Sequence, residues 1–254
     1  MNEKIIIHNN VADLYQALVT RWATIADQAI KERGSFHVAL AGGSTPEKFY
    51  QLLATMVDTL PWLQTHIYFG DERCVAPDHS DSNYRMASQA LLAQVPIPEH
   101  NIHRMAGENP NHEQAAADYQ QSLEQSLPQD THGYHFDLVL LGLGPDGHIA
   151  SLFPDTDILK LHQQLVAPVY VEKFSSWRIS ITFPVLAQAR HVLLIVAGSG
   201  KAEIVKQVLG EKSADFNYPV QQINTDTEWH LDKAAASLFK PVTSKDYYDQ
   251  DSGC

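Results

Sequence analysis

The sequence predicts an α/β fold with three layers, in which a mostly parallel central sheet carries helices on both of its faces. Short apolar, β-prone segments recur along the chain, and several lead directly into a glycine-containing loop and then a helical pattern. The segment 136–141 is nearly all apolar, as expected for a strand buried on both faces of a parallel sheet. Repeated units of strand, loop and helix are typical of this Rossmann-like class.

The first helix carries its own start and stop signals. A predicted strand at 5–8 precedes Asn10, whose side chain suits a helix N-cap, and Gly34 is suited to end the helix. The apolar residues between them recur at steps of three and four and form one face: Val11, Leu14, Leu18, Trp22, Ile25 and Ala29. We therefore predict a single amphipathic helix between Asn10 and Gly34.

The later elements repeat the same arrangement. A strand at 36–41 leads into a loop, and Pro46 fits the first turn of a helix that runs to about residue 56. Three more strands each lead into a loop: 66–69 into 70–73, 136–141 into 142–148, and 192–197 into 198–201. The remaining predicted elements are a strand at 178–183, whose residues alternate, and helices at about 82–94 and 112–127.

The composition limits the kinds of partner. The 254 residues and 44% hydrophobic content suit one domain, which we place at 1–240, followed by a polar tail at 241–254. A net charge of -12 without a Lys/Arg cluster argues against nucleic-acid binding, and no apolar run is long enough to span a membrane. With two cysteines and no apolar signal segment, we expect a cytoplasmic protein, either a monomer or a small homo-oligomer.

The glycine-containing loops should lie together. Ligands of open parallel sheets bind at the carboxyl ends of the strands, where the segments 42–46, 70–73, 142–148 and 198–201 would meet. Because the protein is acidic, an anionic substrate needs a few focused cations, so Arg and Lys residues near these loops are informative.

The loop 142–148, Gly-Leu-Gly-Pro-Asp-Gly-His, is the most informative segment. Its glycines and proline impose an unusual backbone that carries Asp146 and His148. A loop histidine at a strand end is a candidate general base near neutral pH, and a neighbouring carboxylate can orient its ring. An isolated histidine is more often a surface residue, but this setting favours catalysis.

Two further loops suit a phosphate group. The first combines close backbone approach with a helix N-terminus, although an ordinary turn with a capping hydroxyl explains it equally well; it supplies Gly42, Gly43, Ser44 and Thr45. Lys201 begins another helix and can contact a phosphate, or be an ordinary surface lysine. Ile195 and Ala202 break the Walker A pattern, so a nucleoside-triphosphate site is not expected.

The loop 70–73 places Asp71 and Arg73 beside the same crevice, where the alternative is a surface ion pair of little energetic value. Cys74 follows without a sequence partner, and we expect it to have a packing role. The histidines and acids show no metal-ligand pattern, so neither a metal nor another cofactor is expected.

Together these segments resemble the 6-phosphogluconolactonase family. The matching stretches keep the family's order and cover about residues 40–236: 41–46, 71–73, 82–84, 136–142, 144–154, 178–180, 198–202, 229–232 and 234–235. The resemblance implies a fold of the sugar-phosphate isomerase/deaminase type. It also implies hydrolysis of 6-phospho-D-glucono-1,5-lactone, the lactone of the oxidative pentose phosphate pathway, without a cofactor.

The resemblance also assigns roles to residues. His148 would activate water for attack on the lactone carbonyl, and Asp146 would orient His148. The sugar-phosphate site would be lined by Gly43, Ser44, Arg73, Arg178 and Lys201, with the cations near the phosphate or the oxyanion.

Two alternatives remain open. Glucosamine-6-phosphate deaminases of the same superfamily share similar loops, but they continue after the histidine with Phe-Asn-Glu-Pro, where this chain has Ser-Leu-Phe-Pro at 151–154. This difference, and Arg73 after two acids, favours the lactonase. The second alternative is a non-catalytic sugar-phosphate-binding protein that keeps the pocket without turnover.

Overall fold

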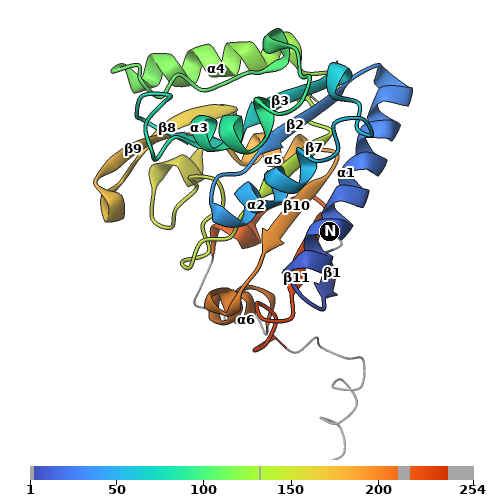
Figure 1. Ribbon diagram of the computed structural model, residues 1–254. Helices are drawn as coiled ribbons and strands as arrows, with labels where there is room; N and C mark the ends of the chain where they lie inside the picture. The colour runs from blue at the N-terminus through green and yellow to red at the C-terminus, as the bar shows by residue number, and fades with distance from the viewer. Residues whose placement is uncertain (1–2, 132, 211–217, 240–254) are drawn as a thin grey trace, which may run out of the picture.

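The computed structural model describes residues 3–131, 133–210 and 218–239, and a six-stranded parallel sheet lies at its centre (Figure 1). The strands lie in the order β1-β11-β10-β7-β2-β3, and all neighbouring pairs are parallel. Their bounds are Glu3–His8 (β1), Phe36–Leu40 (β2), Thr65–Phe69 (β3), Leu138–Leu141 (β7), Val192–Val196 (β10) and Thr227–Asp232 (β11). The predicted parallel sheet is confirmed.

Successive strand residues pack alternately on the two faces of this sheet. On one face, Val38 and Leu140 pack with three helices: α1 (Val11–Arg33), α2 (Ser44–Leu53) and α3 (Asn83–Ala87). On the other face, Ala39 and Val139 pack with α4 (His112–Ser126), α5 (Phe183–Gln188) and α6 (Ala202–Leu209). Helices on both faces confirm the three-layer prediction.

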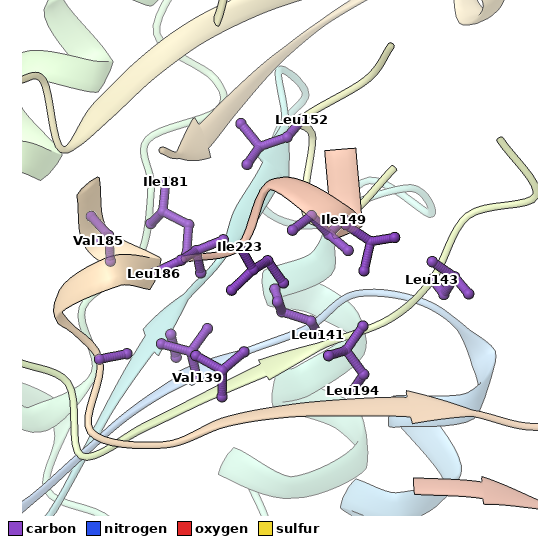
Figure 2. Close-up of a cluster of buried hydrophobic side chains, with 14 of the residues drawn as sticks. Val139, Leu141, Leu143, Ile149, Leu152, Ile181, Val185, Leu186, Leu194 and Ile223 are labelled. Atoms are coloured by element: carbon purple, nitrogen blue, oxygen red, sulfur yellow. The ribbon is translucent and has the colours of Figure 1, made fainter. Parts of the chain in front are cut away.

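The second face forms a continuous apolar core. Figure 2 shows Val139 and Leu141 of β7 and Leu194 of β10 facing Leu186 of α5 and Ile223. All five side chains are buried. Since burial of apolar surface contributes about 25 cal/mol per Å², this layer holds β7 and β10 firmly beneath the loops that follow them.

Helix α1 matches its sequence signals closely. Asn10 Oδ1 accepts a hydrogen bond of 2.9 Å from the Asp13 N–H, and Gly34 ends the helix with a φ of 82°. The apolar face is buried from Leu14 onward, but Val11 is exposed. The prediction for Val11 is wrong because the first turn precedes the part of the helix that packs on the sheet.

A three-stranded antiparallel sheet in the order β4-β9-β8 continues from the carboxyl end of β3. Its strands are Asp71–Arg73 (β4), Val166–Val171 (β8) and Ser176–Ile181 (β9), and α4 packs against it (Figure 1). The prediction of a loop at 70–73 is wrong, because three of these residues pair with β9. Strands β8 and β11 were not predicted.

Several boundaries differ from the prediction. The helix expected at 82–94 is α3 followed by a π-helical turn at Ser88–Leu92, and α2 ends at Leu53. Phe183 begins α5 instead of ending β9, since Pro184 cannot donate to a strand ladder. The predicted tail at 241–254 lies outside the described residues.

The remaining elements are short. A small antiparallel hairpin pairs Gln129–Asp130 (β5) with Gly133–Tyr134 (β6). Short 3-10 turns cover Trp62–Gln64, Glu99–Asn101, Asp157–Lys160, Glu172–Phe174, Ser199–Lys201 and Pro219–Gln222.

Within residues 3–131, 133–210 and 218–239, no helix is both long and apolar enough to cross a bilayer.

Histidine rings stack at the amino-terminal side of β2 and β3, away from the loops. The centroids of His37 and His66 lie 4.5 Å apart, and those of Tyr68 and His103 lie 4.3 Å apart. His37 Nδ1 is 3.1 Å from the Tyr68 hydroxyl. Burial, reinforced by the neighbouring imidazoles, lowers the pKa of His37 to about 3 and that of His103 to about 4.

These pKa values predict that the protein loses stability as it is acidified. Below pH 6.5, His37 of the unfolded chain takes up a proton, whereas His37 of the folded protein does so only near pH 3. The contribution of His37 to the unfolding free energy is therefore fully present above pH 6.5 and is lost as the pH falls below that value. We predict that His37→Gln reduces the loss of unfolding free energy between pH 7 and 4.5 by about 1–2 kcal/mol, measured by urea denaturation. The exposed control His79→Gln should keep the full loss, and an unchanged loss in His37→Gln would contradict the assignment.

Candidate functional site

A cavity of about 230 Å³ opens at the carboxyl ends of β2, β3, β7 and β10. Its wall includes residues from each of the four segments singled out in the sequence: Gly42 and Gly43; Gly70, Asp71 and Arg73; Gly142, Leu143, Gly144, Pro145 and His148; and Lys201. Arg178 reaches it from β9. The order of strands and loops therefore predicts where the cavity lies.

The individual site residues take three kinds of position. The cavity wall includes these predicted residues: Gly42, Gly43, Asp71, Arg73, His148, Arg178 and Lys201. Ser44 and Thr45 are not among the described residues of the wall, and they form the first turn of α2 directly after Gly43. Asp146 stands behind His148 and contacts its ring.

His148 and Asp146 form a hydrogen-bonded pair in the loop after β7. Asp146 Oδ1 bonds His148 Nδ1, and the ring of Phe153 stacks on the imidazole at 3.9 Å. The side chains of His148 and Asp146 are 20% and 29% exposed. Among the described residues, no hydrogen bond reaches His148 Nε2, so this nitrogen remains for a ligand.

The electrostatics of this pair favour a neutral imidazole. Burial lowers the pKa of His148 below 6.5, and although Asp146 and Asp71 raise it, burial outweighs them. Burial raises the pKa of Asp146, but the hydrogen bond and charge of His148, together with the bond from Lys173, bring this pKa below its usual value. At pH 7 the site therefore presents a neutral histidine, oriented by a carboxylate.

Two glycines explain the sequence of this loop. A Cβ on Gly144 would overlap Nδ1 of His148, so only glycine leaves room for the imidazole. Gly147 has a φ of 73°, and its Cβ would collide with the Tyr218 ring. The Gly144 N–H also donates to the His148 carbonyl at 2.8 Å, which closes the loop around the ring.

Three cations line the cavity. Arg73 and Arg178 are direct cross-strand partners of β4 and β9, although like charges at such positions repel each other. The Nε atoms of both are buried and, within the described residues, have no hydrogen-bond partner. Burial lowers the pKa of Arg178 and of Lys201, whose Nζ donates to the Leu143 carbonyl at 2.6 Å. Paired guanidinium groups with unused donors fit a bound anion.

Asp71 and Glu72 belong to a buried polar network beside these arginines. Ser151 Oγ donates to Asp71 Oδ2 at 2.6 Å, and Asn83 Nδ2 donates to Asp71 Oδ1 at 3.1 Å. The Glu72 carboxylate accepts bonds of 2.7–2.9 Å from four donors: the N–H groups of Arg73, Asn83 and Tyr84 and the hydroxyl of Ser82. This carboxylate therefore ties the start of α3 to β4.

The sequence did not single out several residues that shape the site. The role of Glu72 could not be predicted, because the sequence Asp-Glu-Arg is compatible both with a buried carboxylate and with a surface ion pair. Asn83 was attributed to a helix start, although it also approaches Gly42 closely enough to exclude a Cβ there. Burial raises the pKa of Cys74 to about 11, which agrees with a packing role.

Over the described ranges, no three His, Cys, Asp or Glu side chains gather as a metal site would require. The expectation that no cofactor is needed stays a prediction.

Known proteins resemble the chain over most of its length. The profile of the family described as glucosamine-6-phosphate isomerases/6-phosphogluconolactonase matches residues 9–231. The 6-phosphogluconolactonases of Synechocystis sp. and Nostoc sp. are each 40% identical to it, over 217 and 219 residues. Both alignments cover 84% of this chain and 89% of the relative. The chain belongs to this family.

Solved structures of related proteins have the same fold as this chain. The 6-phosphogluconolactonase of Trypanosoma brucei superposes with a TM-score of 0.81 at 27% identity, covering 94% of this chain and 99% of that one. The family match at 9–231 includes every segment of the cavity wall.

The Glu72 network yields a prediction about stability. In Glu72→Gln, an amide NH2 would face two N–H or O–H donors, so at least one hydrogen bond would be replaced by repulsion. We predict a loss of about 1–3 kcal/mol in unfolding free energy, measured by urea denaturation. The exposed control Glu124→Gln should change it by less than about 0.5 kcal/mol. Equal stabilities for both variants would show that Glu72 does not anchor β4.

Proposed function

We propose that this protein hydrolyses 6-phospho-D-glucono-1,5-lactone to 6-phospho-D-gluconate in the oxidative pentose phosphate pathway. The observation that carries the proposal is His148, a neutral imidazole with an available Nε2 in a cavity lined by three cations. The relatives from Synechocystis and Nostoc, named 6-phosphogluconolactonases, support the same reaction.

The first chemical step is proton transfer from water. A water molecule between His148 Nε2 and C1 of the lactone gives its proton to Nε2 while its oxygen bonds to C1. Asp146 holds the ring from Nδ1 and stabilises the imidazolium that results. The base needs a pKa below the working pH, and the lowered pKa of His148 meets that need.

Attack converts the carbonyl oxygen to an oxyanion, which preorganised donors stabilise. Lys201 Nζ donates to the Leu143 carbonyl in the loop that carries His148, so its ammonium group is a candidate donor to the oxyanion. The bond between C1 and the ring oxygen then breaks, and protonated His148 returns its proton to that oxygen. The histidine ends the cycle neutral, and the new carboxylic acid releases its proton to the solvent at pH 7.

The phosphate of the substrate requires a cationic subsite. Arg178 carries a buried Nε that has no hydrogen-bond partner in the part of the chain that the structure describes, and the N-terminus of α2 at Gly43 opens onto the same cavity. Backbone N–H groups at a helix start and a guanidinium together suit a phosphate dianion. We assign the phosphate to Arg178 and the N-terminus of α2.

The deaminase alternative has less support from the geometry. Where the deaminase pattern carries a glutamate, the segment 151–154 places Ser151 on Asp71 and Phe153 on the His148 ring. Neither group can act as an acid for ring opening. The non-catalytic alternative is distinguished by turnover alone.

His148→Ala tests the base. We predict that kcat falls about 10²–10⁴-fold, the usual contribution of a general base. The measurement is proton release from freshly made 6-phosphoglucono-δ-lactone at pH 7, corrected for spontaneous hydrolysis, with folding checked by circular dichroism. A folded His148→Ala protein with near-wild-type kcat would remove His148 from the mechanism. A wild-type protein that does not accelerate the reaction would refute the lactonase proposal itself.

Arg178→Ala tests the phosphate subsite. A contact that is equally strong in the ground and transition states affects KM rather than kcat. We predict that KM rises at least about tenfold and that kcat stays within about threefold. Lys206→Ala, on the exposed side of α6, is the matched control and should change neither. A large loss of kcat at constant KM would instead place Arg178 at the oxyanion.

A further inference from the structure

The tip of the β8–β9 hairpin lies against the back of the His148–Asp146 pair. The tip comprises the 3-10 turn Glu172–Phe174 and Ser175, whose φ of 46° makes the reversal. Lys173 Nζ is 3.3 Å from Asp146 Oδ2, the carboxylate oxygen that does not bond His148. A residue 27 positions away therefore completes a chain from Lys173 through Asp146 to His148.

Aromatic contacts hold the tip in this place. The Phe174 ring meets the Phe153 ring edge-on at 5.9 Å, and Phe153 stacks on His148. The Arg178 guanidinium lies over the Phe174 ring, 5.3 Å from the ring centroid. Lys173 Nζ lies 5.6 Å from the same centroid. The tip thus contacts Phe153, which stacks on the base, and also a cation of the cavity wall.

The ion pair itself contributes little to stability. The Lys173 side chain is 54% exposed, and ion pairs between exposed side chains add little to protein stability. Lys173 is also absent from the described residues of the cavity wall, so the structure does not place it on the substrate. Its clearest physical effect is to restrain Asp146, which is partly exposed on a loop.

We propose that Lys173 is a positioning residue of the active site, which fixes the Asp146 carboxylate so that His148 Nε2 points at the reacting carbon. The proposal rests on the proposed function. It adds the hairpin tip to the active site, since Lys173 bonds the carboxylate oxygen of Asp146 that does not bond His148.

The charges around His148 determine the sign of the expected effect. Asp146 and Asp71 raise its pKa, and Lys201 lowers it. Lys173 neutralises part of the Asp146 charge, so removing Lys173 lets Asp146 stabilise the imidazolium more strongly. The pKa of His148 should then rise. The other charged groups of the cavity wall, Arg73 and Arg178, are left unchanged.

The experiment compares Lys173→Met with Lys173→Arg and the wild type. For Lys173→Met we predict a three- to tenfold lower kcat, a small share of a general base's total contribution, with KM within about twofold. The acid limb of kcat/KM should move up by about 0.3–1 pH unit. Lys173→Arg should restore both values. Lys160→Met, which removes a similar lysine paired with Asp157, is the control and should match the wild type.

A second measurement is independent of turnover. His148 is titrated by NMR in histidine-labelled, substrate-free protein, and its signal is assigned by its loss in His148→Ala. An upward shift in Lys173→Met that Lys173→Arg reverses supports the coupling even if the wild type proves not to be a lactonase. An unmoved or lowered His148 pKa overturns the proposal, as does a raised KM with unchanged kcat, which would make Lys173 a phosphate ligand.

Discussion

Gly70 connects the parallel sheet to the three-stranded antiparallel sheet, and the geometry of the site depends on this connection. Its N–H donates to the Leu40 carbonyl in the parallel sheet at 2.9 Å, and its carbonyl accepts from the Ile181 N–H in the antiparallel sheet at 2.9 Å. One residue later β4 begins, so Arg73 and its partner Arg178 are carried over the edge where the parallel strands end. Without this change of sheet, Arg73 and Arg178 would not share a cavity with His148.

The site also shows how an acidic protein accommodates an anion. The net charge of -12 repels phosphates at long range, so binding depends on cations held close to the ligand. Burial disfavours the charged forms of Arg178 and Lys201, and a bound phosphate would offset that cost. The same burial keeps His148 neutral at pH 7. The same cavity therefore holds cations that can bind an anion, Arg178 and Lys201, and a neutral histidine that can act as a base, His148.

Sequence reasoning succeeded where a local pattern carries the physical cause. Asn10 and Gly34 mark helix ends by their own backbone chemistry, and glycines after apolar strands locate the loops of a parallel sheet. It failed where the cause is a distant contact. Asp71 to Arg73 are a strand because β9 pairs with them, and β11 is a strand because it inserts between β1 and β10. Lys173 gave no signal, since its relevance arises only when the hairpin folds back onto Asp146.

The central claim is that the substrate lies with its phosphate at Arg178 and its reacting carbon at His148. The most direct measurement is a crystal structure with the product, 6-phospho-D-gluconate, bound. We predict that the phosphate contacts Arg178 and the N-terminus of α2, and that the C1 carboxylate lies within about 3.5 Å of His148 Nε2. A product bound in the opposite direction, with its phosphate against His148, would contradict it.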